Sequence, residues 1–570
     1  ETTLNNDLRL QWSNIYGAHA IDVMGGWRYN NYQFSYNSMS GYNNENDKLP
    51  NLKKNMQYIN YNGTYDNWID MTYYLNANYN YKNRYFADFV VSSQASSRFG
   101  DNTKDGFQMA GVSWGVFPSL QLGWLISSEP WFKTGKGIQY LKLTAGVEKN
   151  GNDNLVDYYA ARTYWESMQV TENTVGLYLK NIENSTIQWE TTTKYNVGLE
   201  GSFLNNRLHA GLDLFWHKTD DLLTLKELNF VSGMNKYWTN EGSMTNKGFE
   251  VNVNAALINK KNWKWELGAS MGHYNNEVTD LPNTTNNKIE VYKNVYDAAN
   301  DSWTSVQSGT IHGFTNSVYG NENILTAVGY AAGSFYGWQT NGVFASDAEA
   351  SQASDAPGTN GYLLYPTGMK ENPYRNFQAG DVRFVDQNGD GVIDDADKVV
   401  IGNPNPDIYG NIYSSLTWKD LRLDVNFKYS LGNDIYNYQR SVIEGLNTTY
   451  NQSTAALRRW TFEGQQTDMP KACYMDSEDW RNNERFSDRW IEDGSYLKLK
   501  NVRLTYKIPY SNSWLLGLKV WGEANNVFTV TKYLGTDPEM SSRNSSYYRG
   551  VDNGQIPFGR SFNVGVSINL

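Results

Sequence analysis

Apolar and polar residues alternate along two neighbouring stretches of the chain, 195–203 and 208–216. The short polar break 204–207 separates the two stretches. A period of two over ~10 residues, repeated on both sides of a tight turn, predicts a β-hairpin with one apolar and one polar face. Strands of water-soluble sandwiches are usually ~5–6 residues long, whereas strands of ~9–11 residues with this alternation can cross a membrane at a tilt. The pattern therefore predicts a transmembrane β-barrel.

The same alternation recurs almost from one end of the chain to the other and predicts fifteen strands in an all-β, antiparallel fold. Besides the two above, the predicted strands are 8–15, 21–29, 73–81, 85–91, 120–126, 141–147, 249–257, 263–271, 412–418, 423–431, 497–508, 516–524 and 562–570. Polar loops are expected over 30–70, 275–406 and 432–493. The phase of the alternation changes near Asn501, which predicts a β-bulge.

The connections between these strands alternate between short turns and long loops. Outer-membrane barrels have short periplasmic turns and long extracellular loops, so the first predicted strand begins outside and the last ends in the periplasm. Single-chain bacterial barrels have an even number of strands. An odd count that begins outside predicts that residues 1–570 are the C-terminal part of a larger barrel, interrupted in an outside loop.

Composition and charge narrow the classes of protein that fit. Mean hydropathy is −0.64, and no apolar run reaches the ~20 residues of a transmembrane helix, which excludes a helical membrane protein. Aromatic residues make up 15% of the chain, which suits aromatic girdles at the membrane interfaces, although a soluble aromatic-rich β protein is an alternative. A net charge of −11 without a basic patch argues against nucleic acid as a partner. Cys473 is the only cysteine, so internal disulfides are excluded.

Several segments resemble SusC/RagA-type TonB-dependent outer-membrane transporters. In chain order they are 75–100, 117–124, 187–199, 246–250, 328–337, 380–384, 493–502 and 534–539. They cover nearly the whole chain.

The resemblance implies a barrel of roughly 22 strands around a plugged lumen, of which the chain supplies about fifteen. It also implies a SusD-like surface lipoprotein as partner, outer-membrane lipid around the wall, and energy passed on by the TonB complex. The plug domain and the first strands have no counterpart in this sequence. They would belong to an N-terminal portion of the same transporter, which is a further expected partner.

One acidic loop, 386–397, has the spacing of a calcium-binding loop. Oxygen-bearing residues occupy loop positions 1, 3, 5, 9 and 12, with a glycine at 6 for the sharp turn and a backbone carbonyl at 7. These residues are Asp386, Asn388, Asp390, Asp394 and Asp397, with Gly391 and Val392 at the sixth and seventh positions. The spacing predicts a structural Ca²⁺ site, and the alternative is an acidic turn without a metal. The flanking residues look extended, so a signalling EF-hand is not expected.

Aromatic residues in the predicted outside loops are candidates for ligand binding. They are Trp303, Tyr374, Trp480, Tyr547 and Tyr548. Aromatic faces stack on sugar rings while neighbouring amides and carboxylates bond hydroxyl groups. The alternative is that these rings pack on one another or on the partner lipoprotein.

No arrangement typical of an enzyme is present in the sequence. The five histidines lack metal-ligand spacing, and no nucleophile elbow or phosphate loop stands out. We therefore expect a non-enzymatic outer-membrane protein that imports nutrient oligomers with TonB-derived energy, with oligosaccharide favoured over peptide. The alternatives are a passive porin and a secreted carbohydrate-binding β protein.

Overall fold

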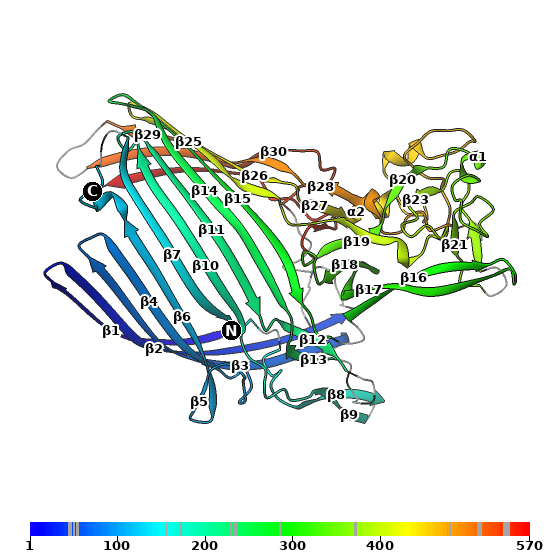
Figure 1. Cartoon of the computed structure of the whole chain (residues 1–570), viewed down its shortest axis with the longest axis horizontal. Coiled ribbons are helices and arrows are strands. Elements are labelled where there is room, and N and C mark those ends of the chain that lie inside the picture. Colours follow the sequence, from blue (N-terminus) through cyan, green and yellow to red (C-terminus); the bar gives the residue numbers. More distant parts are fainter. Residues whose placement is uncertain are drawn as a thin grey trace. The chain divides into compact units, whose positions relative to one another are not determined.

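The computed structural model describes residues 1–569 except 44–47, 49–51, 53–55, 134, 136, 155–156, 172–173, 229–230, 232–233, 235, 284–286, 370–372, 476, 478–479, 510–515 and 540–547. Fifteen long strands follow one another in chain order along one sheet, with the short strand β5 (Phe107–Met109) paired to one of them (Figure 1). The fifteen are β1 (Thr2–Tyr16), β2 (His19–Tyr42), β3 (Gln57–Tyr81), β4 (Tyr85–Ser96), β6 (Val112–Leu125), β7 (Ile138–Asn152), β10 (Glu190–Phe203), β11 (Leu208–Asp220), β14 (Ser243–Lys260), β15 (Trp263–Asp280), β25 (Ile408–Trp418), β26 (Leu421–Leu431), β29 (Tyr496–Ile508), β30 (Gly517–Thr531) and β32 (Ser561–Asn569). The predicted strand count and order are confirmed.

Tight turns join most of the strand pairs at the ends predicted to be periplasmic. Between β10 and β11, Leu204, Asn205 and Asn206 all have left-handed backbone angles, with φ of 55°, 60° and 58°. The Arg207 N–H donates to the Phe203 carbonyl at 3.0 Å and closes the turn. Asparagine adopts this conformation more easily than other non-glycine residues, which explains its presence in the turn.

The predicted bulge is also confirmed. In the pairing of β26 with β29, Asn426 faces Asn501 and Phe427 faces Leu499, so that Lys500 is the extra residue. Because of this extra residue, the apolar side chains before and after Lys500 lie on the same face of the sheet. The alternation along the sequence therefore changes phase at this point.

The prediction of a polar loop over residues 30–70 is wrong for most of that segment. Strands β2 and β3 continue through it, with Asn30 paired to Asp70 and Asn37 paired to Gly63. Apart from Met39 and Ile69, residues 30–42 and 62–70 are polar, aromatic or glycine, so the aliphatic alternation that marks a membrane-facing strand disappears although the backbone ladder continues. Strand pairing therefore extends beyond the stretch that the sequence pattern reveals.

The two faces of the long strands differ as predicted. In the hairpin of β10 and β11, Val197 and Leu214 expose 48% and 49% of their surface. On the opposite face, the Ser202 hydroxyl and His209 Nδ1 are hydrogen-bonded at 2.7 Å. An exposed apolar face opposite a hydrogen-bonded polar face is the expected wall of a membrane barrel.

The chain divides into two compact units, residues 1–200 with 215–244, and residues 201–214 with 245–570. The first carries two outside hairpins, β8 (Tyr164–Thr171) with β9 (Thr174–Asn181) and β12 (Leu223–Glu227) with β13 (Lys236–Asn240). Its buried cluster comprises Phe99, Phe117, Ala160, Ala161, Ile187 and Trp189. This core therefore includes loop residues as well as a residue at the outer end of β6.

The second unit contains small sheets, and all but one of their strands lie within the segments expected to be polar loops. Five strands, β16 (Lys288–Asp297), β17 (Ser302–Val318), β18 (Asn321–Ala327), β19 (Ser334–Trp338) and β24 (Lys398–Gly402), form one sheet. Three smaller groups are β20 (Thr340–Val343) with β23 (Val382–Phe384), β21 (Leu364–Pro366) with β22 (Tyr374–Asn376), and β27 (Asp434–Asn437) with β28 (Ile491–Asp493) and β31 (Val551–Asp552). Short helices α1 (Asp347–Ala350) and α2 (Tyr438–Ile443) lie between them. Every helix in the part of the chain that the structure describes is too short or too polar to span a bilayer.

Candidate ligand-binding loops

The acidic loop 386–397 is held in shape by its own carboxylates. Asp386 accepts hydrogen bonds from the backbone N–H groups of Gly389 and Gly391, both at 2.7 Å. Asp397 accepts one from the backbone N–H of Asp394 at 2.9 Å. Gly389 and Gly391 have φ of +71° and +82°, the left-handed region that glycine adopts without strain.

Strand β16 fastens the same loop from outside. Asn294 donates its backbone N–H to Asp390 at 2.6 Å and its side-chain amide to Asp394 at 2.7 Å. The Lys293 ammonium group donates to the Asn388 carbonyl at 3.0 Å. The predicted loop residues are thus anchored to the five-stranded sheet of the outside region.

Burial makes this loop an unfavourable place for uncompensated negative charge. Desolvation raises the pKa of Asp397 to about 7 and also raises the pKa of Asp394. The side chain of Val392 is fully buried. Among the described residues, no group of three or more His, Cys, Asp or Glu side chains is arranged so that it could hold a metal ion. The loop has the oxygen chemistry that Ca²⁺ prefers, and the calcium site stays a prediction.

Two of the predicted ligand-binding aromatics lie together. The rings of Trp303, on β17, and Tyr374, on β22, are 5.3 Å apart between centroids, and Tyr296 lies 5.2 Å from Trp303. Burial raises the pKa of Tyr374. These rings pack on one another, as the alternative interpretation expects.

The other predicted aromatics are separate from this pair. Tyr548 packs edge-on against Tyr319, with 6.2 Å between the ring centroids, beside a buried cluster that includes Phe335 and Trp490. Tyr547 lies outside the described residues. The described members of the predicted set are therefore divided between separate clusters of side chains.

Trp480 lines a pocket of about 590 Å³ in the outside region of the second unit. Its wall includes three further aromatic residues, Tyr292, Trp338 and Tyr365, which were not among the aromatic residues expected to bind ligand. The Trp338 indole N–H donates to the Asp394 carbonyl at 2.7 Å, and the Trp480 indole N–H donates to Glu484 at 2.9 Å. Both rings are therefore held by hydrogen bonds. Trp338 directly follows a segment that carries the family resemblance, 328–337, which is the only signal in the sequence that could have drawn attention to it.

Charged groups of both signs accompany the aromatic rings in this pocket. Three arginines and three acids line it: Arg375, Arg481, Arg485, Glu290, Asp394 and Asp395. The Arg485 guanidinium lies 5.2 Å from the centre of the Trp338 ring and is almost completely buried. Aromatic faces surrounded by fixed donors and acceptors can bind the apolar faces and the hydroxyl groups of a sugar at the same time.

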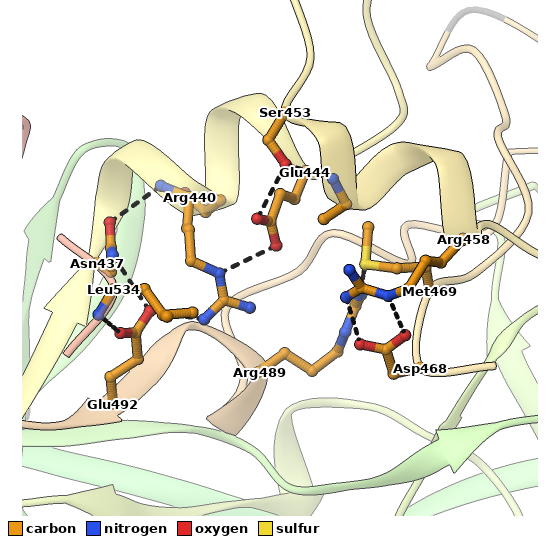
Figure 2. Close-up of polar contacts among 12 residues, drawn as sticks. Asn437, Arg440, Glu444, Ser453, Arg458, Asp468, Met469, Arg489, Glu492 and Leu534 are labelled. Atoms are coloured by element: carbon orange, nitrogen blue, oxygen red, sulfur yellow. Dashed lines mark hydrogen bonds and ion pairs between the residues drawn. The ribbon is translucent and has the colours of Figure 1, made fainter. Parts of the chain in front are cut away.

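A buried network of charges fixes the loop that carries Trp480. Figure 2 shows Arg440, on α2, paired with Glu444 at 3.0 Å and with Glu492 at 2.6 Å. The Ser453 hydroxyl donates to Glu444 at 3.1 Å, and the Leu534 backbone N–H donates to Glu492 at 2.8 Å. The network joins outside segments that are distant in sequence. Arg440 thereby ties together Glu444 and Glu492, the two ends of the segment that carries Trp480.

Comparison with protein families gives one match over most of the chain. The family described as "TonB dependent receptor-like, beta-barrel" matches residues 1–365. "TonB-dependent receptor P3" of Formosa agariphila is 26% identical over 98% of the chain and 52% of its own length. "TonB-dependent receptor SusC" of Bacteroides thetaiotaomicron is 27% identical over 100% of the chain and 50% of its own length. The chain spans about half the length of these curated relatives.

Solved structures agree on the fold. The chain superposes on "Structure of the RagAB peptide transporter" with a TM-score of 0.74, at 22% identity, over 99% of this chain and 55% of that one. The same system in its "open-open" state gives a TM-score of 0.73 at 22% identity, over 100% of this chain and 54% of that one. These similarities confirm the resemblance to SusC/RagA-type proteins and the barrel fold.

Proposed function

Because this chain belongs to the TonB-dependent receptor β-barrel family, we propose that it forms the greater part of the wall of an active nutrient importer. It is a multi-pass β-barrel protein of the outer membrane. The observation that carries the proposal is the sheet of fifteen long strands with an exposed apolar face and a polar opposite face. Such a wall pairs its backbone groups between strands and separates a wet lumen from hydrocarbon.

The remainder of the transporter belongs to this proposal as well. We place the plug and roughly seven further strands on an N-terminal portion, which would complete a barrel of roughly 22 strands. A SusD-like surface lipoprotein would cover the outside loops, and the TonB complex would act through the N-terminal portion. The wall itself carries no catalytic role in this scheme, in keeping with relatives that are receptors and transporters.

For the cargo we favour an oligosaccharide. Support comes from the pocket in which Trp338, Tyr365 and Trp480 lie among fixed charged and amide groups. A peptide is the second candidate, because the RagAB system is described as a peptide transporter.

The test uses the full-length transporter with its lipoprotein partner and the substitution Trp480→Ala. Calorimetric titration with a panel of neutral oligosaccharides and of peptides should show binding of an oligosaccharide, and the substitution should weaken it ~3–10-fold, since one ring contact contributes ~0.5–1.5 kcal/mol. Trp165→Ala is the matched control, because Trp165 is an exposed tryptophan on the outside strand β8 and does not line this pocket. Equal affinities in the two variants would exclude the pocket, and binding of peptides alone would favour the second candidate.

Active import and passive diffusion differ in their need for TonB. In cells without TonB, uptake of the cargo should stop if the chain belongs to an active importer. Continued uptake at the original rate would support the porin alternative instead.

We also propose that the loop 386–397 binds Ca²⁺ as a structural ion. Asp386, Asn388, Asp390, Asp394 and Asp397, with the Val392 carbonyl, would supply the oxygen donors. The raised pKa of Asp397 supports the proposal, because a nearby cation would relieve the cost of burying this charge. The ion would stiffen the segment that supports Trp338.

A further inference from the structure

The first unit contains a largely apolar pocket of about 680 Å³ on its outside end. Its apolar wall comprises Ile69, Met71, Ala95, Phe99, Met109, Val112, Trp114 and Ala161. The loops that follow β4 and β7 complete it and place Asp101, Arg162 and Glu183 along it. The cargo pocket proposed above lies in the other unit and shares no residue with this one.

Strand register shows which face of the wall this pocket occupies. Along β3 and β4, Met71 pairs with Ala95, two residues beyond the pair of Tyr73 with Ser93. Because side chains alternate between faces, Met71 shares the face of Tyr73 and Leu75, which expose 45% and 40% of their surface. Asp70 points to the opposite face, where it pairs with Arg98 at 3.6 Å. The pocket therefore opens on the apolar face of the sheet, which is the face toward the membrane.

The height of the pocket in the membrane follows from strand geometry. Met71 precedes the turn residue Lys82 by eleven positions, a distance of ~36 Å along the strand at ~3.3 Å per residue. At a tilt of ~40° this corresponds to ~28 Å of height above the periplasmic turn, close to the outer edge of an apolar band ~25 Å tall. The pocket thus lies where acyl chains of the outer leaflet meet their headgroups.

A hairpin forms the outer wall of the pocket. β5 pairs with the start of β6 so that Met109 faces Val112 and Phe107 faces Trp114. The Trp114 ring is buried and lies 5.3 Å from the ring of Tyr73. Met109 and Val112 expose 41% and 42% of their surface although both are apolar. Exposed apolar side chains around a pocket that is continuous with the lipid-facing surface indicate a site completed by hydrocarbon.

We propose that this pocket binds one acyl chain of an outer-leaflet membrane lipid. The chain would enter from the apolar face and contact Met71, Met109 and Val112. The headgroup would remain at the polar rim near Arg162, as amphipathic groups do at a membrane interface. The site makes no use of the cargo pocket, so the inference stands or falls independently of the import function.

Native mass spectrometry of the full transporter with its lipoprotein partner tests this site. The detergent-solubilised complex is titrated with lipid A, the acylated anchor of outer-leaflet lipopolysaccharide, and the lipids that remain bound are counted. Two variants act on exposed positions by different means: Met109→Asp places a charge in the site, and Val112→Phe fills the site without a charge. Each should weaken lipid binding roughly tenfold, the effect of withdrawing about two methylene groups from burial.

Met168→Asp is the control, because Met168 is a similarly exposed methionine, 49% against 41% for Met109, on the outside hairpin of β8 with β9. It should bind lipid as the parent does. Resistance to unfolding in cold SDS and unchanged cargo uptake would show that each variant has assembled. Equal lipid retention by parent and both pocket variants would overturn the proposal. The proposal would also be overturned if Met109→Asp lost lipid binding and Val112→Phe did not. It would equally be overturned if the molecule that the parent complex releases were a protein chain rather than a lipid.

Discussion

The strands of the wall expose apolar side chains, whereas the outside segments of the second unit bury them. In the wall, Leu257 and Leu504 expose 45% and 48% of their surface. In the outside segments, Phe335, Phe344 and Trp490 are completely buried. The wall has hydrocarbon as its solvent and needs no apolar core, whereas the outside segments are surrounded by water and must build cores of their own.

Ion pairs also differ in burial between the wall and the outside loops. On the wall, the pair of Arg422 with Asp424 leaves both side chains substantially exposed, at 55% and 31%. Where β29 meets the outside loop 532–539, Lys498 is buried and pairs with Asp537 at 3.0 Å and with Glu539. Exposed pairs contribute little to stability, whereas a buried ion that loses its partner is costly.

The largest effect is expected when the buried cluster is broken. Lys498→Met would leave Asp537 buried without its cation and Glu539 with Lys428 but without its buried partner, which should destabilise the loop 532–539 by ~3–5 kcal/mol. Hydrogen exchange of the backbone amides in this loop measures the loss directly. If exchange were unchanged, the ion cluster would not be what holds the loop on the wall.

Lys428 provides a matched control for Lys498. It also pairs with Glu539, at 2.7 Å, but 45% of its side chain is exposed. Lys428→Met leaves Glu539 paired with Lys498, so the loss should be at most ~1 kcal/mol. Similar losses in the two variants would show that burial does not decide the strength of these pairs.

The same cluster predicts a dependence on pH. Burial alone would raise the pKa of Glu539, but hydrogen bonds from Lys428 and Lys498 outweigh it and lower the pKa to about 2. Folding therefore favours the ionised form, so this contribution is complete above the ordinary pKa of 4.5 and is lost as pH falls toward 2. Amide exchange in the loop, corrected for its intrinsic pH dependence, should rise over that window in the parent. Glu539→Gln should flatten this change.

A second test compares two adjacent residues of β15. Leu267 lies on the apolar face and Glu266 on the polar face. Leu267→Arg should destabilise the barrel in liposomes by ~2–4 kcal/mol, while Glu266→Arg should cost far less, because only the first places a charge in hydrocarbon. Guanidinium unfolding of the full transporter measures both. Equal costs would mean that the exposed apolar face of this strand is not in contact with lipid.

The difference between wall and outside segments also explains what the sequence could and could not predict. Alternation is imposed by lipid on one face and water on the other, so it located all fifteen strands and even the bulge at Lys500. Above the membrane that constraint ends, and the continuation of β2 and β3 through residues 30–42 and 57–70 went unrecognised.

The binding surfaces were still harder to predict, because they depend on contacts between distant segments. Trp480 and Trp338 line one pocket although 142 positions separate them, and no local pattern encodes that meeting. Trp303 and Tyr374 are aromatic residues of the predicted outside loops, as Trp480 is, yet they pack on each other. Composition identified suitable residue types, and only the fold decides which of them line a pocket.

The smallest effect is expected from calcium, which would add stability to an outside segment that already has a core. Ile393, within the acidic loop, is fully buried in a cluster with Phe344, Phe377 and Phe384. At a Ca²⁺ concentration ten times the dissociation constant, binding adds ~1.4 kcal/mol to the stability of the folded loop. The double substitution Asp386→Ala with Asp390→Ala should therefore increase amide exchange around residues 386–397 in Ca²⁺ by more than it does in chelator. Because these carboxylates also accept backbone hydrogen bonds within the loop, a part of the loss should persist in chelator. If parent and variant differed equally in Ca²⁺ and in chelator, the carboxylates would serve the backbone alone, and the acidic turn without a metal would be the correct interpretation.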